Sequence, residues 1–190
     1  MKRVFAQMLA LCALAGCASP SGVFVDRHAV EIGGSLFFQP VGSPDSDEGL
    51  LVLDGPITPE TSFSFLYTLE TSNVTGLLIT QSDGGNLVAS HQVGDAIRAR
   101  GIHTTVLGWC YSACVNIFIA GDNRLIHKDG QLGLHPASDP EFGYQLSKPY
   151  WGKLGLSNVN EAVYSRKTDE LWYLSAERAQ ELRLATEIFE

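Results

Sequence analysis

Between residues 50 and 127, four short apolar runs alternate with three segments of helical character. The run at 50–57 (LLVLDGPI) is almost entirely apolar, which is typical of a strand buried on both faces of a sheet. Further strands are predicted at 74–82, 102–108 and 123–127. Parallel strands need crossover connections, and helices commonly provide them. The alternation therefore predicts a single α/β domain with repeated β-α units and a mainly parallel sheet.

The three helical segments carry start and stop signals. The segment at 58–71 opens with Thr58, a residue type favoured at N-caps, and continues with a proline, which suits the first helical position. The segment at 84–101 ends at Gly101, and glycine is common where helices stop. A third, short helix is expected at 111–121. These signals place helices between the predicted strands.

The segments on either side of this pattern are less regular. Residues 22–42 alternate loosely and break at a pair of glycines, which suggests a short hairpin or edge strands. Residues 43–49 form an acidic, turn-rich loop, and the chain from residue 141 onward is expected to form further helices. The predicted domain therefore covers 50–190, preceded at 17–49 by a tether and short edge strands.

The N-terminus has the pattern of a secretory signal: a basic start, MKR, and an apolar run too short to span a bilayer. The run ends in LAGC at 14–17, which resembles the lipobox of bacterial lipoproteins. The resemblance implies that residues 1–16 are a lipoprotein signal peptide and that Cys17 becomes the lipidated, membrane-anchored N-terminus. Ala18 in the next position implies the outer membrane, facing the periplasm. An ordinary signal peptide with a chance cysteine is the alternative.

Charge narrows the range of partners. The formal net charge is −8, and no basic stripe exists that could neutralise phosphates, which argues against nucleic-acid binding. An anionic membrane surface would repel such a chain, so membrane attachment must be apolar or covalent.

Export also affects the two cysteines of the domain, Cys110 and Cys114, because exported proteins meet oxidising conditions. On one helix, residues four apart share a face with Cα atoms roughly 6 Å apart, within the range of a disulfide. Two buried thiols are an equal alternative. A metal site is less favoured, since no further ligands lie nearby in the sequence.

Two loops follow predicted strands and open helices, at the edge of the sheet where ligands bind in α/β folds. In SDGGN (82–86), paired glycines can turn backbone N–H groups toward a site, although an ordinary tight turn has the same residues. In GWCYSAC (108–114), Ser112 stands at a strand-to-helix turn beside the N–H of Ala113, as in a nucleophile elbow. A serine there is more commonly an N-cap. A later strand-like run, LGLHP, ends in His135.

The stretches LLITQSDGGN, CYSACVNIFIAGDNR, GLHP and YLSAERAQELRL together resemble the Clp protease proteolytic subunit and its relatives of the ClpP/crotonase fold. The resemblance runs from about residue 50 to 186. It implies that Ser112 is the nucleophile and His135 the general base, and that the N–H groups of Gly85 and Ala113 form the oxyanion hole. It implies no cofactor and no metal.

The third member of the catalytic set departs from the family pattern. Where the family keeps an aspartate, this chain has Leu171, and the neighbouring acids Asp169 and Glu170 are the candidates to orient His135. A Ser–His dyad is the alternative. A Ser–Lys pair is less favoured. The nearest lysines downstream of Ser112 are Lys128, Lys148 and Lys153, and none of them lies in a comparable motif.

Three classes of function follow. The first is an envelope-anchored serine hydrolase, an ATP-independent peptidase acting on peptides or unfolded chains. The second is an inactive relative that binds peptides or a protein partner. The third, an enzyme acting on acyl-CoA, is disfavoured by export, and the scarcity of ATP outside the cytoplasm argues against an ATPase partner. The family resemblance further implies that the chain could form a homo-oligomer.

Overall fold

The computed structural model describes residues 28–190, which form nine strands and six helices. The predicted signal peptide at 1–16 and the predicted lipidation site Cys17 lie outside the described residues. The strands are β1 (Val30–Gly33), β2 (Leu36–Pro40), β3 (Glu48–Asp54), β4 (Asn73–Ser82), β5 (His103–Tyr111), β6 (Arg124–His127), β7 (Gln131–Leu134), β8 (Trp172–Ser175) and β9 (Glu187–Phe189). The helices are α2 (Pro59–Thr71), α3 (Leu87–Arg100), α4 (Ala113–Ile119), α5 (Pro140–Lys153), α6 (Ser157–Tyr164) and α7 (Ala176–Glu181).

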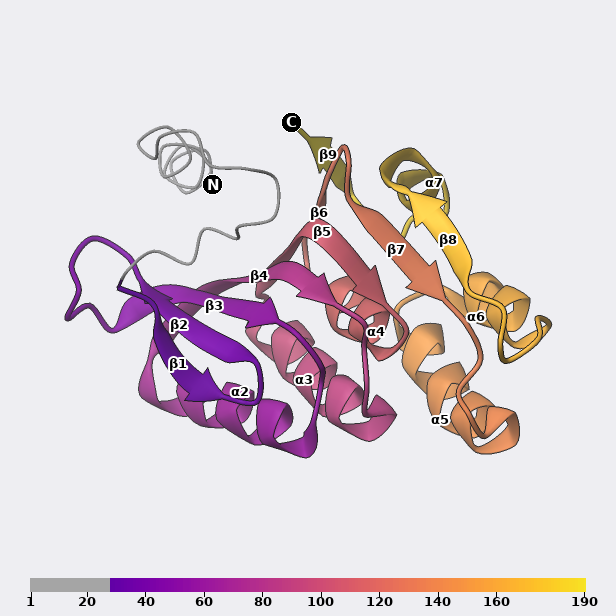
Figure 1. The fold of residues 1–190 in the computed structure, drawn as a ribbon, viewed down its shortest axis with the longest axis horizontal. Coiled ribbons are helices and arrows are strands. Elements are labelled where there is room, and N and C mark those ends of the chain that lie inside the picture. Colours follow the sequence, from indigo (N-terminus) through magenta and orange to yellow (C-terminus); the bar gives the residue numbers. More distant parts are fainter. Residues whose placement is uncertain (1–27) are drawn as a thin grey trace.

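Strands β3, β4, β5 and β6 lie side by side in chain order and run parallel. Crossovers between sequential parallel strands are right-handed, which places their helices on the same face of the sheet. Figure 1 shows α2, α3 and α4 together behind the strands. The predicted single α/β domain with a mainly parallel sheet is confirmed.

The segment before residue 50 joins the same sheet. Strands β1 and β2 form an antiparallel hairpin, and β2 continues antiparallel to β3, as expected for edge strands. The hairpin turns at Gly33 and Gly34, which both have positive φ angles (104° and 60°). A side chain at Gly34 would collide with the backbone of Thr61 in α2, so a glycine is needed where the hairpin approaches the helix.

The sheet divides at β5. The first half of this strand pairs with β6, through Thr104 to Val106, and its last three residues pair with β7. Strand β8 then pairs antiparallel with β7, and β9 pairs parallel with β6. The prediction of helices after residue 141 is confirmed for α5, α6 and α7. It missed β8 and β9, which have only four and three residues.

The helix boundaries agree with their sequence signals. The Thr58 side chain accepts a hydrogen bond from the Thr61 N–H and completes a capping box at the start of α2. Gly101 ends α3 with a left-handed φ of 64°. Helix α4 begins at Ala113, later than predicted, because Tyr111 still belongs to β5. Within residues 28–190, no helix is long and apolar enough to cross a membrane.

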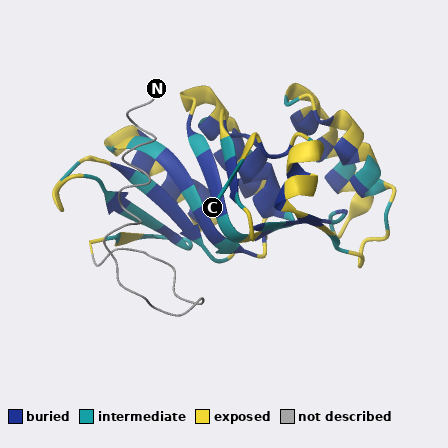
Figure 2. Ribbon diagram, turned by 90° about the horizontal axis from the view of Figure 1, so that it is seen from above, coloured by how far each residue is buried: buried dark blue, intermediate teal, exposed yellow. Residues whose placement is uncertain are grey.

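The core lies between the sheet and the helices (Figure 2). Leu51 and Leu53 of β3 are buried in it, and so is Ile79 of β4. Their neighbours Leu50 and Leu78 point to the opposite face and remain partly exposed. The prediction that the strand at 50–57 is buried on both faces therefore holds fully for the face toward the helices, which gather on one side in Figure 1, and in part for the other face, where Val52 is buried and Leu50 is not.

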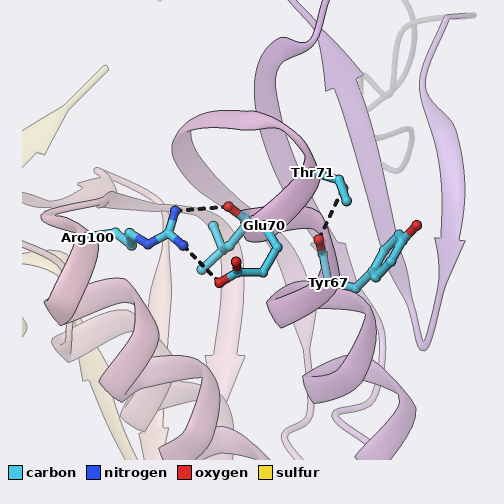
Figure 3. A network of polar contacts seen from close by, with 5 residues as sticks. Tyr67, Glu70, Thr71 and Arg100 are labelled. Atoms are coloured by element: carbon cyan, nitrogen blue, oxygen red, sulfur yellow. Dashed lines mark hydrogen bonds and ion pairs between the residues drawn. The ribbon is translucent and has the colours of Figure 1, made fainter.

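Helices α2 and α3 are also joined at their C-terminal ends (Figure 3). The Arg100 guanidinium donates to the Leu69 carbonyl at 2.9 Å and to the Glu70 carboxylate at 3.1 Å. One turn of α2 is closed by Thr71, whose hydroxyl donates to the Tyr67 carbonyl at 3.1 Å. Both charged side chains of this link are substantially exposed, so the ion pair contributes at most about 1 kcal/mol.

Candidate active site

The register of two parallel strands brings Ser112 and His135 to the same edge of the sheet. Tyr111, the last residue of β5, is paired with Gly133 in β7. Ser112 therefore lies one residue beyond the pair and His135 two residues beyond it, at the carboxyl ends of both strands. The N–H of Ser112 donates to the Gly133 carbonyl at 2.7 Å, which fastens the serine turn to β7. This edge is where ligands bind in parallel α/β sheets.

The backbone at Ser112 has the conformation of a sharp strand-to-helix turn. Its φ of 55° and ψ of −127° are unusual for any residue other than glycine. Ser112 occupies the N-cap position of α4, yet its side chain makes no capping hydrogen bond. The hydroxyl is thus not used as a cap, which removes the commoner explanation for a serine in this place. Strained backbone of this kind is concentrated at functional sites.

A disulfide brackets the serine. Cys110 and Cys114 are bonded to each other, with Cα atoms 5.3 Å apart, and both residues are completely buried. The two cysteines do not share one helix: Cys110 lies in β5 and Cys114 in α4, because the strand continues to Tyr111. Of the two alternatives drawn from the sequence, the structure contains the disulfide rather than two thiols. The bond links the strand to the helix across Ser112.

The glycine pair of the loop after β4 packs against the serine turn. Gly84 has a φ of 88°, and a side chain there would lie 2.6 Å from the Tyr111 carbonyl oxygen and 2.8 Å from the Ala113 nitrogen. Gly85 has a φ of 140°, and a side chain there would collide with the carbonyl of Ile57. Both positions therefore require glycine. The loop is held by a hydrogen bond from the Ile57 N–H to the Gly84 carbonyl at 2.8 Å.

The backbone N–H groups of Gly85 and Ala113 are free to act as donors. Neither donates to another group among residues 28–190. Ala113 is the first residue of α4, and the first N–H groups of a helix have no partner within the helix. Both residues border the same cavity as Ser112. The pair thus has the donors that an oxyanion hole requires.

The cavity has a volume of about 190 Å³. Its lining combines the predicted site residues with the inner faces of α5 and α6: Gly85, Leu87, Ser112, Ala113, Asn116, Leu134, His135, Ala137, Ser138, Ser147, Trp151, Asn160, Val163 and Tyr164. No aspartate or glutamate is among them. A second hollow of about 410 Å³ between α5 and α6 contains neither Ser112 nor His135. No group of three metal-ligating side chains is found in residues 28–190.

The histidine side of the cavity is less complete. His135 directly follows β7, and its Nδ1 atom is buried without a hydrogen-bond partner among the described residues. Asp169 and Glu170 are exposed on the turn before β8, and neither makes a hydrogen bond or ion pair with His135. Leu171 lies beside β7, with a methyl group 3.2 Å from the place of a side chain at Gly133. Orientation of His135 by either acid stays a prediction.

A polar network behind the cavity joins three helices through Asn116, one turn after the serine. The Asn116 amide donates to the Ser90 hydroxyl at 3.2 Å and accepts from the Trp151 indole at 2.8 Å. Its backbone carbonyl accepts from the Tyr150 hydroxyl at 2.7 Å. The ring of His91 stacks on Tyr150 with centroids 4.1 Å apart. Burial lowers the pKa of His91 to about 4, although the carboxylate of Asp95 opposes this shift.

The sequence did not single out Asn116 or Asn160 as residues of the site. Both are buried asparagines within helices, and asparagine has no spacing or motif that marks such a position. Only the packing of α4 and α6 against the cavity reveals them.

Solved structures with a similar fold are peptidases. A peptidase from Plasmodium falciparum matches with a TM-score of 0.60 and 19% identity, over 74% of this chain and 95% of that one. ClpP1 from Listeria monocytogenes matches with a TM-score of 0.60 and 21% identity, over 74% of this chain and 91% of that one. The catalytic domain of the ClpP protease from Plasmodium falciparum matches with a TM-score of 0.59 and 18% identity, over 74% and 84%.

The chain has a ClpP-like fold. No protein-family profile and no curated protein sequence matches it. At these identities the likeness to ClpP concerns the fold, so the chemistry of the site has to be argued from its own residues.

Proposed function

We propose that this chain is a serine hydrolase, most simply an ATP-independent peptidase, that uses Ser112 as nucleophile and His135 as general base. The observation that carries the proposal is the single cavity bordered by Ser112, His135 and two free backbone N–H donors. The ClpP-like fold supports a peptidase in particular, since its solved neighbours are peptidases.

The residues support a two-step acyl transfer. His135 takes the hydroxyl proton of Ser112 as the serine oxygen bonds to the carbonyl carbon of the substrate. The oxyanion that forms accepts hydrogen bonds from the N–H groups of Gly85 and Ala113. His135 then returns the proton to the leaving amine, the C–N bond breaks and an acyl-enzyme remains. Water, deprotonated by His135, attacks the acyl-enzyme and releases the acid and the serine.

The test compares the wild-type protein with Ser112→Ala, with folding checked by circular dichroism. Each is treated with a fluorophosphonate probe and offered unfolded casein and short esters. We expect labelling and turnover in the wild type and neither in the variant. The matched control is Ser157→Ala, which removes an exposed hydroxyl at the start of α6 and should label like the wild type.

Two results would contradict the proposal, one by excluding Ser112 as the nucleophile and the other by favouring an inactive protein. Equal labelling of the wild type and of Ser112→Ala would exclude the serine. Absence of labelling and turnover in a folded wild type would favour an inactive relative that binds peptides or a partner.

The proposal includes the location of the enzyme. The LAGC sequence at 14–17 supports a lipid anchor on Cys17, which would hold the domain at the bacterial outer membrane on its periplasmic side. Metabolic palmitate labelling of the full-length chain tests this point. Labelling that persists in Cys17→Ala would contradict it.

A further inference from the structure

His135 lacks the partner that a general base of this kind needs. A serine hydrolase holds the imidazole in one tautomer through a hydrogen bond to Nδ1, which leaves Nε2 free to take the serine proton. In this chain Nδ1 is buried and has no partner among residues 28–190. The acids near Leu171 are exposed, and no carboxylate from residues 28–190 lines the cavity. The partner therefore has to come from another kind of side chain.

Asn160 is a buried polar side chain in the same cavity. It is 2% exposed, and no hydrogen bond of its amide is found within the described part of the chain. It lies on α6 together with Val163 and Tyr164, at the spacing that places three residues on one helix face, and all three border the cavity. Its amide atoms are not among the fully enclosed unpaired polar atoms of residues 28–190, so the amide is open to the cavity and its acceptor oxygen is available to a partner there.

The other polar side chains that line this part of the cavity are less suited. The Asn116 amide is already used by Ser90 and Trp151. The Tyr164 hydroxyl is paired with the Ser147 hydroxyl at 3.2 Å. Asn160 is the buried group whose acceptor oxygen is still unused.

An amide oxygen is chemically adequate for this role. It accepts the Nδ1–H of a neutral imidazole and fixes the tautomer, as in proteases with a Cys–His–Asn set. Unlike a carboxylate, it adds no negative charge to stabilise the imidazolium. Catalytic hydrogen bonds are often formed fully only when substrate is bound.

We propose that Asn160 is the positioning residue of His135, its amide oxygen accepting the Nδ1–H, so that the chain works with a Ser–His–Asn set. The proposal rests on the proposed function and gives its third member. It takes the place of Asp169 and Glu170 in that role.

The main test is an NMR titration of the His135 ring, which does not depend on activity. In the wild type we expect ring nitrogen shifts of the Nδ1–H tautomer. In Asn160→Asp, a carboxylate beside the ring should raise the pKa of His135 by about 1 unit or more. Ser138→Asp is the matched control, because it adds the same charge at the exposed rim of the cavity and should raise that pKa less.

Kinetics give a second, independent measurement. Asn160→Ser removes the amide but keeps a small polar group, and it should lower kcat about tenfold or more with a KM near that of the wild type. In Asn160→Asp, the acid limb of the kcat/KM profile should move to higher pH by as much as the pKa of His135 moves.

Several results would overturn the proposal. They are an Nε2–H tautomer in the wild type, an equal shift in Asn160→Asp and Ser138→Asp, or a loss confined to KM in Asn160→Ser. A lowered pKa of His135 in Asp169→Asn or Glu170→Gln would assign the role to that acid instead. A wild type that fails to react with the fluorophosphonate would refute the hydrolase, whereas the NMR result would still decide whether Asn160 and His135 are partners.

Discussion

The two sides of the cavity differ in what fixes them. On the serine side, the position of Ser112 is fixed mainly through the backbone. Its N–H donates to the Gly133 carbonyl, a disulfide links the residues on either side of it, and Gly84 packs closely against it. On the histidine side, His135 depends on its side chain, and the ring nitrogen Nδ1 has no partner among the described residues. The comparison shows that the two N–H groups of the proposed oxyanion hole are in place in the folded chain, whereas the ring of the proposed general base has no partner among the described residues.

The difference also suggests how each side responds to mutation. A site made of backbone is sensitive to residues that fit only one conformation, such as glycine. A site made of side chains is sensitive to the chemical nature of its neighbours. Predictions on both sides and on the helices that join them can therefore test the comparison.

The largest effect is expected from Gly85→Ala, on the serine side. A methyl group at φ 140° would collide with the Ile57 carbonyl, so the loop must move and its N–H must leave the cavity. Loss of one oxyanion donor lowers kcat by about 100-fold or more. Steady-state kinetics on a peptide or ester substrate would measure this.

The control for that prediction is Gly42→Ala. Gly42 also has a positive φ, 88°, but no atom lies within 4 Å of its added methyl group. Both variants should lose stability through backbone strain, and only Gly85→Ala should lose kcat. A Gly85→Ala protein with wild-type kcat would mean that this N–H does not bind the oxyanion.

A smaller effect is expected from breaking the disulfide in the double variant Cys110→Ala, Cys114→Ala. Without the bond, Ser112 and the Ala113 N–H should be held less firmly, which lowers kcat about tenfold and changes KM little. Hydrogen exchange of the segment 108–116 should become faster, and mass spectrometry would show it. The exchange measurement remains informative even if the substrate is unknown.

Val115→Ala is the matched control for the double variant. It removes packing from the same buried helix and leaves the disulfide intact. It should lower the melting temperature without faster exchange at the serine turn. If the two variants had equal kcat values, the disulfide would have no role in positioning the serine.

The smallest effect concerns His91, which stacks on Tyr150 in the network between α3 and α5. Burial lowers its pKa to about 4 in the folded protein, against an ordinary value of 6.5 for histidine, so the unfolded chain binds the proton more readily between these values. Stability should therefore fall as pH drops from 6.5 to about 4, by at most about 3 kcal/mol from this group. Well above pH 6.5, His91 is neutral in both the folded and the unfolded chain, so it should cause no further change of stability with pH.

His91→Phe tests this and keeps a ring that can stack on Tyr150. Urea denaturation at neutral pH and at about pH 4 should show a smaller loss of stability in the variant than in the wild type. Carboxylates contribute to acid unfolding in both proteins and cancel in the difference. Parallel curves for the two proteins would show that the burial of His91 does not govern acid stability.

Much of the fold could be predicted because local signals and global pattern agree. The apolar run of β3, the Thr58 cap and the terminal Gly101 each indicate an element that needs no distant partner to be recognised. Strands β8 and β9 could not be predicted, because such short strands are stabilised by the strand beside them rather than by their own sequence.

The residues of the candidate site also differ in whether they could be predicted from the sequence. Ser112, Gly85 and Ala113 lie in turns whose residue types and order carry information, and the structure brings them together with His135 in one cavity. Asn160 could not be found from the sequence, because its position depends on how α6 packs against α5 beside the cavity. A side chain contributed by a remote helix has no local signature.

The burial of the disulfide has a consequence for how the protein is made. Cys110 and Cys114 are both inaccessible in the folded chain, so an oxidant can reach them only before the core closes or when it reopens. A chain that folds first in a reducing cell would keep two thiols beneath its serine, and exposure to air after purification would not repair them. The redox state of Cys110 and Cys114 would then depend on whether the chain was oxidised before it folded, and two samples with the same sequence could differ in activity.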